Sequence, residues 1–251
     1  MRGTHRYAAW LGLVLCGLEG VAANAQQPTP VKPPQWPVAG AGQEQTPVPV
    51  MRPQPRATDV PLDSVPARLR EAVRSVVEHP TLAAGGPAEE FTGQLAVYRW
   101  LLDHPDRTAR SWRQLGAPCL DITQRGEGRF GWGDAHGSDV RWDTVFRDGT
   151  RQIWYAEGAV KPGPLVPLMP VRAVVVMHYG EHVDPLGRST LWHQADLFVQ
   201  TDSKAAAVAL RLFGSSVPRL TEQCLGQLEM FFSAMTNYIQ RHPEKTAMLL
   251  K

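Results

Sequence analysis

The chain has 251 residues, 43% of them apolar, and a formal net charge of +2 at neutral pH. A chain of this length can bury a sizeable core. The small net charge, without a basic stripe that alternates with aromatic residues, is not typical of nucleic-acid-binding proteins, so we predict no nucleic-acid partner.

The first 25 residues have the order of an export signal. Arg2 and Arg6 give a positive start, residues 8–16 form a short apolar run, and Ala23-Asn24-Ala25 is a cleavage site of the A-x-A kind. The apolar run is too short to cross a membrane. We therefore predict cleavage after residue 25 and a periplasmic or extracellular location. Lipid attachment at Cys16 and an uncleaved anchor are the alternatives.

Residues 26–66 hold 11 of the chain's 22 prolines and have no continuous apolar pattern. Each proline fixes φ and removes an amide donor, so the stretch favours extended, solvated chain. We predict a disordered linker between the export signal and the folded part. A proline-rich ligand for an aromatic groove on a partner is the alternative interpretation.

Residues 67–245 are predicted to form one domain, followed by a short tail over 246–251. The first part of the chain after the linker has apolar residues at helical spacing in three stretches: 66–77, 94–103 and 108–115. Between the first two, residues 81–91 are broken by Gly85-Gly86-Pro87 and predict a weak strand or a loop.

From residue 119 the apolar period changes towards two, which is typical of strands. Six strands are predicted: 119–125, 128–133, 139–147, 151–160, 171–182 and 189–200. In the third, we expect a single face to hold Val140, Trp142, Thr144 and Phe146. Asp148-Gly149 predicts a tight hairpin, and the four prolines of 161–170 predict a crossing loop.

The chain ends in a long predicted helix over 215–242, with Ser215 or Ser216 as its cap, after a shorter one over 202–213 that Gly214 closes. Its apolar residues recur every three or four positions: Val217, Leu220, Cys224, Leu228, Phe231, Met235 and Tyr238. Leu225, Phe232 and Ile239 widen this stripe, so most of the helix must be covered. Such a helix spans roughly 35 Å.

Cys119 and Cys224 are the cysteines that remain after removal of the signal. In an oxidising compartment they could pair. Because Cys224 lies on the apolar stripe, we prefer two buried free thiols, with pairing as the alternative.

This order of elements resembles the START-like, helix-grip superfamily, which includes lipid-transfer domains, plant pathogenesis-related proteins and polyketide cyclases. The resemblance covers about residues 80–242. It rests on the stretches Leu95-Ala96-Val97-Tyr98-Arg99-Trp100-Leu101-Leu102 and Ser111-Trp112-Arg113, five or six antiparallel strands and the long last helix. It implies an α+β fold with short helices near the start. In that fold a curved antiparallel sheet of about six or seven strands wraps around the C-terminal helix, with a cavity between them.

Three histidines are the strongest candidates for chemistry: His178, His182 and His193. If the hairpin closes tightly on Pro185-Leu186, His178 faces His193 across two strands. Their shared face would be the core face, with Val174, Val176, Ala195, Leu197 and Val199. Two imidazoles in a cavity could shuttle a proton or bind metal. A register shift of one residue would separate them. The chain has no established metal-ligand spacing, so a structural or surface role is preferred and we predict no metal site.

Eight tryptophans can fill the core or line the cavity for an apolar ligand. We predict eight ligand-binding residues: Trp142, Trp154, Arg172, His178, His193, Leu228, Phe231 and Met235. Arg172, or alternatively Arg141 or Arg151, is the group expected to hold a carboxylate or phosphate.

We therefore expect an exported domain that binds a small apolar or amphipathic ligand without catalysis. The serines lie in no nucleophile-elbow sequence and no glycine-rich phosphate loop follows a strand, so we predict no cofactor. One alternative is an enzyme of cyclase or hydratase type, with His178 or His193 as the catalytic candidate. Another is an interaction module with a filled core, whose proline-rich arm reaches a protein partner that the sequence does not identify.

Overall fold

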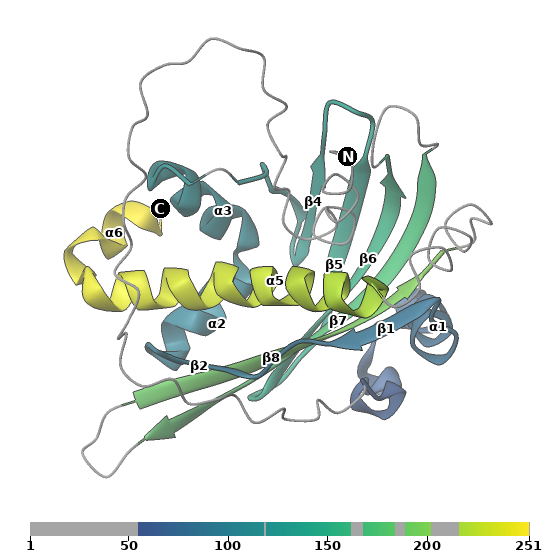
Figure 1. Ribbon diagram of the computed structural model, residues 1–251, viewed down its shortest axis with the longest axis horizontal. Coiled ribbons are helices and arrows are strands. Elements are labelled where there is room, and N and C mark those ends of the chain that lie inside the picture. Colours follow the sequence, from purple (N-terminus) through teal and green to yellow (C-terminus); the bar gives the residue numbers. More distant parts are fainter. Residues whose placement is uncertain (1–54, 118, 162–167, 184–188, 202–215, 251) are drawn as a thin grey trace.

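The computed structural model describes residues 55–117, 119–161, 168–183, 189–201 and 216–250. The predicted export signal, most of the linker and the helix predicted over 202–213 lie outside these residues. The described part is α+β: an antiparallel sheet is crossed by the long helix α5 (Ser216–Arg241), as Figure 1 shows. The predicted fold class is confirmed.

The sheet has the strand order β1-β8-β7-β6-β5-β4-β3, and β2 also pairs with β8. The strands are β1 (Leu82–Gly85), β2 (Glu89–Thr92), β3 (Thr123–Gly126), β4 (Arg129–Gly133), β5 (Asp139–Arg147), β6 (Arg151–Val160), β7 (Met169–Val183) and β8 (Ser189–Gln200). Three of them, β5, β6 and β8, have the predicted bounds, because their alternating apolar residues and flanking turns mark them clearly.

The stretch 81–91 forms the two short strands β1 and β2, which together line one edge of β8. They are separated at Gly86, where a Cβ would lie 2.5 Å from Oε1 of Glu229. A side chain at this position would displace the carboxylate of Glu229 and crowd Cβ of Leu225, which lies 3.1 Å away. The break between the strands lets the helix approach β8 closely.

One face of the sheet packs against α5, with α2 (Leu95–Asp103) and α3 (Pro105–Gln114) beside it. The large side chains that are fully buried in this main core come from both the helices and the strands: Tyr98, Leu101, Leu102, Phe130, Trp132, Met177, Leu191, Leu225, Met235 and Leu249. Leu249 lies in α6 (Thr246–Leu249), so the stretch predicted as a tail packs on this core. The predicted grip of the sheet on the last helix is thus a packed core of aliphatic and aromatic side chains.

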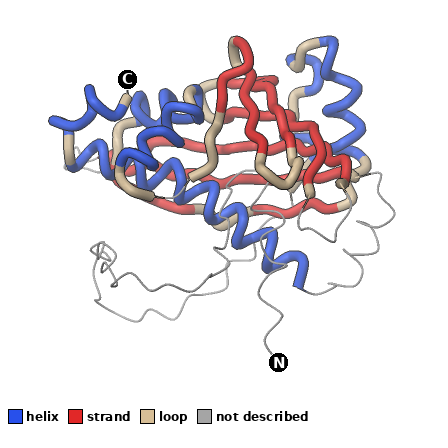
Figure 2. The backbone as a smooth tube through the Cα atoms, turned by 90° about the horizontal axis from the view of Figure 1, so that it is seen from above, coloured by secondary structure: helices blue, strands red, loops and turns tan. Residues whose placement is uncertain are grey.

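The opposite face is covered by α1 (Ala67–Glu78) and by two short 3-10 helices, η2 (Ala57–Asp59) and η3 (Leu62–Ser64). Figure 2 shows α1 and α5 on opposite sides of the strands. This second, smaller core is mainly aliphatic: Val60, Val65, Val73, Val76, Val77, Val145, Ile153, Tyr155, Val174, Val176 and Phe198. The end of the stretch predicted as linker, residues 55–66, therefore packs on the sheet through two buried valines.

A bulge in β5 changes the face of one predicted residue. The pairing with β6 shifts between Thr144 and Phe146, and Phe146 pairs with Ile153. Ile153 belongs to the smaller core, against which Phe146 also packs, whereas Trp142 belongs to the main core. The expectation that Trp142 and Phe146 share a face is wrong, because the extra residue at the bulge reverses the alternation.

Two smaller expectations concern the thiols and membrane spans. Within the described part, Cys119 and Cys224 are not joined by a disulfide, as the sequence favoured. Cys224 is buried and Cys119 is half-buried. Across the same residues, none of the helices combines the length and the apolar character that crossing a bilayer requires.

Candidate functional site

The register of the β7–β8 hairpin decides which face each histidine takes. His178 pairs with Gln194, and His193 pairs with Tyr179. Because neighbouring residues of a strand point to opposite faces, His193 lies on the α5 side and His178 on the α1 side. The predicted pairing of His178 with His193 in one cavity is wrong.

The reason is the length of the connection between the strands. The last pair is Val183 with Ser189, which leaves five residues between them. The predicted hairpin closes on a two-residue turn, with an even number of residues between the paired strands. Because the observed number is odd, the register of the hairpin is shifted by one residue. The same shift moves Val174 and Val176 away from the core face and into the smaller core on the α1 side.

The eight predicted ligand-binding residues consequently divide between the two faces. Six lie in or beside the main core under α5: Trp142, Trp154, His193, Leu228, Phe231 and Met235. Arg172 and His178 lie on the α1 side. Arg172 pairs across the strands with Glu157 and lines, with Arg141, a surface hollow of about 500 Å³. It cannot serve as the acid-binding group of the main core.

A chain of hydrogen-bonding groups leads from the edge of the sheet into the main core. Tyr98 on α2 places its Oη 2.8 Å from Nδ1 of His193 on β8. Nε2 of His193 lies 3.3 Å from Oε2 of Glu89 on β2. Tyr98 and His193 are fully buried, whereas the side chain of Glu89 is 37% exposed. These three hydrogen-bonded side chains therefore connect the solvent with the interior of the main core.

The protonation of this chain follows from its surroundings. Burial raises the pKa of Tyr98 well above its ordinary value, and the charges of Glu229 and Glu89 raise it further. The phenol thus keeps its proton at neutral pH, and its O–H can donate to Nδ1 of His193. With that tautomer, Nε2–H of His193 donates to the carboxylate of Glu89. Both ring nitrogens are then occupied inside the protein.

Aromatic rings surround the buried end of the chain. The ring of Phe91 lies 4.7 Å from that of His193 and 5.4 Å from that of Tyr98, measured between centroids. Phe232 reaches in from α5, edge-on to Tyr98 at 6.5 Å. Phe232 also contacts Trp154 on β6, whose ring stacks on it at 6.2 Å between centroids. These rings form a continuous aromatic surface between the sheet and the helix.

Trp154 brings an unsatisfied donor into this surface. The residue is 4% exposed, and its Nε1 has no hydrogen-bond acceptor among the described residues. Trp112, by contrast, donates from its Nε1 to the carbonyl of Phe231 at 3.0 Å. A buried donor without an acceptor costs about 1–3 kcal/mol. The indole N–H of Trp154 is the point where the core can hydrogen-bond an oxygen from outside the chain.

Glu229 is a buried carboxylate that the sequence reasoning missed. Its Oε1 accepts a hydrogen bond from the amide of Ala195 on β8 at 2.8 Å, beside the Gly86 break. Its spacing could have predicted its burial: Glu229 lies four residues after Leu225 and three before Phe232, on the apolar face of the helix. Tyr98 and Glu89 were also missed, since only the fold brings α2 and β2 to β8.

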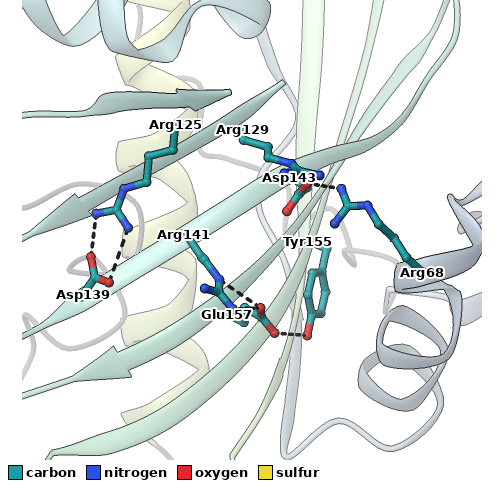
Figure 3. A network of polar contacts seen from close by, with 8 residues as sticks. All are labelled: Arg68, Arg125, Arg129, Asp139, Arg141, Asp143, Tyr155 and Glu157. Atoms are coloured by element: carbon teal, nitrogen blue, oxygen red, sulfur yellow. Dashed lines mark hydrogen bonds and ion pairs between the residues drawn. The ribbon is translucent and has the colours of Figure 1, made fainter. Parts of the chain in front are cut away.

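The opposite face of β3 to β6 carries a network of arginines and carboxylates, shown in Figure 3. Its pairs are Arg125–Asp139 at 2.7 Å, Arg129–Asp143 at 3.0 Å, Arg68–Asp143 at 2.5 Å and Arg141–Glu157 at 2.6 Å, with the hydroxyl of Tyr155 donating to Glu157 at 3.1 Å. Most of these groups are exposed, so each pair contributes about 1 kcal/mol or less. This network is mostly exposed to solvent, whereas Tyr98 and His193 in the Glu89–His193–Tyr98 series are fully buried.

No family model matches the chain, and no curated protein matches it either. Solved structures of similar arrangement include a conserved protein from Geobacillus kaustophilus, at 15% identity over 63% of this chain and 97% of that one, with a TM-score of 0.41. A hypothetical protein from Helicobacter pylori gives 13% identity, coverages of 65% and 93%, and a TM-score of 0.38.

A third solved structure is the di-domain ARO/CYC BexL from the BE-7585A biosynthetic pathway, at 13% identity over 68% of this chain and 56% of that one, with a TM-score of 0.35. The three identities are 15% or lower and the three TM-scores lie below 0.5, so these structures carry no argument about the family or the function of this chain. The function must therefore be argued from the residues of this chain.

Proposed function

We propose that this protein is an exported domain that binds a small amphipathic ligand between the sheet and α5, without catalysing a reaction. The observation that carries the proposal is the indole N–H of Trp154, a buried donor in an otherwise aromatic surface for which the described part of the chain offers no acceptor. A carbonyl or hydroxyl oxygen of a ligand supplies the missing acceptor.

The surroundings of Trp154 define the chemistry of the ligand. The rings of Phe91, Tyr98 and Phe232 offer apolar faces to its body. Glu229 and Glu89 raise the pKa of Tyr98 through their charge, and the same charge repels an anionic ligand. The site therefore favours a neutral molecule with an oxygen acceptor at one end over the carboxylate or phosphate expected from Arg172.

Entry of the ligand requires a change in the packing. Trp154 and Phe232 are both buried and their rings stack. A ligand that reaches Nε1 of Trp154 must separate this stack, so binding is coupled to a displacement of α5 relative to β6. Because protein interiors are close-packed and have few voids, a ligand can enter this core only if the packed groups move apart.

The position of the two catalytic candidates gives less support to the enzymatic alternative. Both nitrogens of His193 are engaged by Tyr98 and Glu89, so neither is available to take a proton from a substrate. His178 lies on the other face of the sheet. The Glu89–His193–Tyr98 chain holds β2 and α2 against β8.

The test is to purify the full chain under native conditions, measure its mass by native mass spectrometry and extract what is bound. We expect a small neutral molecule that leaves on denaturation. Trp154→Phe keeps the ring and removes the N–H, so it should reduce retention about tenfold, the loss of roughly one hydrogen bond. Trp112→Phe removes an N–H that already has an acceptor and should leave retention unchanged.

Two outcomes would contradict the proposal. A chain that carries no ligand and takes up none from a lipid extract has a core filled by its own side chains, as in the interaction-module alternative. Equal retention by the wild type and Trp154→Phe would show that the indole donor is not used.

The exported location has its own test. N-terminal sequencing of the protein from its native source should begin at Gln26, because the first 25 residues have the order of a cleavable signal. A sequence that begins at Met1 or Arg2 would refute export by this route.

A further inference from the structure

A second cluster of ionisable side chains lies on the α1 side of the sheet, away from the core under α5. Its members are Asp59 of η2, His178 of β7 and Asp196 of β8. One nitrogen or oxygen atom from each of them lies within 4.8 Å of the atoms from the other two. The cluster therefore joins a segment near the start of the folded part to the central hairpin.

The hairpin register creates this arrangement. Asp196 pairs with Val176, so His178, two residues further along β7, is its diagonal neighbour on the same face. Nε2 of His178 lies 3.3 Å from Oδ2 of Asp196. Asp59 approaches from the layer above the sheet, where the neighbouring Val60 is buried in the smaller core.

Asp196 carries the observation that points to a bound group. It is 7% exposed, and within the described part of the chain its Oδ1 has no hydrogen-bond partner. Two of its neighbours on this face, Val176 and Phe198, are apolar, and the side-chain amide of a third, Gln194, donates to the carbonyl of Gly86. A buried carboxylate oxygen without a donor is costly, and a second carboxylate beside it adds repulsion unless a cation lies between them.

The arginine that pairs across the strands with His178 is engaged by other groups. Arg151 pairs across the strands with His178, but its guanidinium binds Asp148 at 2.9 Å. It also donates to the backbone carbonyl of Asp59 at 2.9 Å. Arg151 thus holds η2 over the cluster and leaves Oδ1 of Asp196 unsatisfied.

We propose that Asp59, His178 and Asp196 bind a divalent transition-metal ion, for which Zn²⁺ is the best match. Zn²⁺ accepts an imidazole nitrogen together with carboxylate oxygens, whereas Ca²⁺ and Mg²⁺ take oxygen ligands. Three protein ligands leave one position for water, which can enter because the side chain of His178 is 22% exposed. The bound ion ties η2 to the hairpin and so stabilises the attachment of residues 55–66.

The test is a titration of the full chain with Zn²⁺, followed by calorimetry and thermal unfolding. We expect one ion per chain and a rise in Tm of about 5–10 °C when free zinc exceeds its Kd about a hundredfold. Asp59→Asn and Asp196→Asn should each weaken binding at least about tenfold and abolish most of the rise in Tm. Ca²⁺ at the same concentration should produce no rise.

The matched controls are His182→Gln and Asp63→Asn. His182 lies on the same strand and face as His178 but is exposed outside the cluster, and Asp63 is an exposed acid of η3. Both variants should bind Zn²⁺ like the wild type.

An unchanged Tm in the wild type, or equal zinc affinity in the wild type and Asp59→Asn, would overturn the proposal. Either result would leave the cluster as a His178–Asp196 ion pair. Should Asp196→Asn fail to fold, Asp59→Asn decides the question alone, because its side chain lies in a half-exposed turn. Ligand retention under α5 does not enter this measurement, so the two proposals fail independently.

Discussion

The two faces of the sheet are built from alternate residues of the same strands, yet they treat polar groups differently. Under α5, polar side chains are buried and linked in a directed chain, Glu89–His193–Tyr98. Under α1, the core is mainly aliphatic, and apart from the cluster around the buried Asp196, the charged groups in Figure 3 form arginine–carboxylate pairs that are mostly exposed. A buried network is costly when incomplete, whereas an exposed one is not. The α5 face is therefore where loss of a single polar atom should matter most.

The largest effect should come from Phe232, which links the aromatic surface of the helix to the sheet. Phe232→Ala should lower the free energy of unfolding by about 3–5 kcal/mol, the range for emptying a packed aromatic site. Phe231, the predicted centre of the stripe, is only half-buried, so Phe231→Ala should cost less than half as much. Urea unfolding of both variants measures the difference. Equal losses would mean that the helix is rotated from the orientation described.

The second effect tests whether the α1 face belongs to the stable unit. Deletion of residues 26–66 removes Val60 and Val65 from the smaller core. Two buried valines contribute about 1.5–3 kcal/mol each, partly offset by ordering entropy, so the loss should be about 2–4 kcal/mol. Deletion of residues 26–54 alone should change stability by less than about 0.5 kcal/mol, because its proline-rich composition offers little apolar surface. Thermal unfolding of the two deletions compares them directly, and identical melting temperatures would contradict the packing of residues 55–66.

The third effect compares one hydroxyl on each face. Tyr98→Phe leaves Nδ1 of His193 buried without a donor and should cost about 1–3 kcal/mol. Tyr155→Phe removes a partly exposed bond to Glu157 and should cost about 0.5–1 kcal/mol. Denaturant unfolding at neutral pH provides both values. A larger loss for Tyr155→Phe would reverse the distinction between the faces.

The smallest effect concerns Asp148 in the β5–β6 turn. Burial raises the pKa of Asp148, but hydrogen bonds from Thr150 and Arg151 outweigh this and hold it at about 2, below the ordinary value of 3.8. Because the folded pKa is the lower one, the contribution is present above about pH 4 and is lost as the pH falls towards 2. The side chain is 33% exposed, so solvent screening limits the contribution to about 1 kcal/mol.

Asp148→Asn should remove this part of the acid sensitivity. The measurement is urea unfolding of the wild type and the variant at pH 2 and pH 5. A stability difference between the two proteins that stays the same at both pH values would contradict the role given to this carboxylate.

The sequence predicts the elements better than their relation in space. Strands such as β5, β6 and β8 are marked by alternation, and α5 by its stripe, because both patterns are local. Register is not local. A shift of one residue in the β7–β8 register places His178 on the face opposite His193, and one bulge moves Phe146 to the opposite face from Trp142. The amino-acid composition shows neither the number of residues in the β7–β8 connection nor the position of the extra residue in β5.

The candidate site was only partly accessible from the sequence for the same reason. Trp154, His193, Leu228 and Met235 are apolar or aromatic residues in core strands and on the stripe, so periodicity finds them. The hydrogen bond of Tyr98 to His193 joins residues 95 positions apart and has no sequence signature. The cluster of Asp59, His178 and Asp196 also depends on the attachment of residues 55–66, which their proline content conceals.

The central claim is that the indole N–H of Trp154 donates a hydrogen bond to an oxygen atom of a bound ligand. The most direct measurement is the NMR spectrum of the ¹⁵N-labelled indole groups, before and after addition of the extracted ligand, with Trp154→Phe to assign the signal. We predict that the Trp154 N–H resonance shifts as it forms a hydrogen bond, while that of Trp112, already bonded to Phe231, does not. A Trp154 resonance that stays unchanged at saturating ligand would contradict the claim.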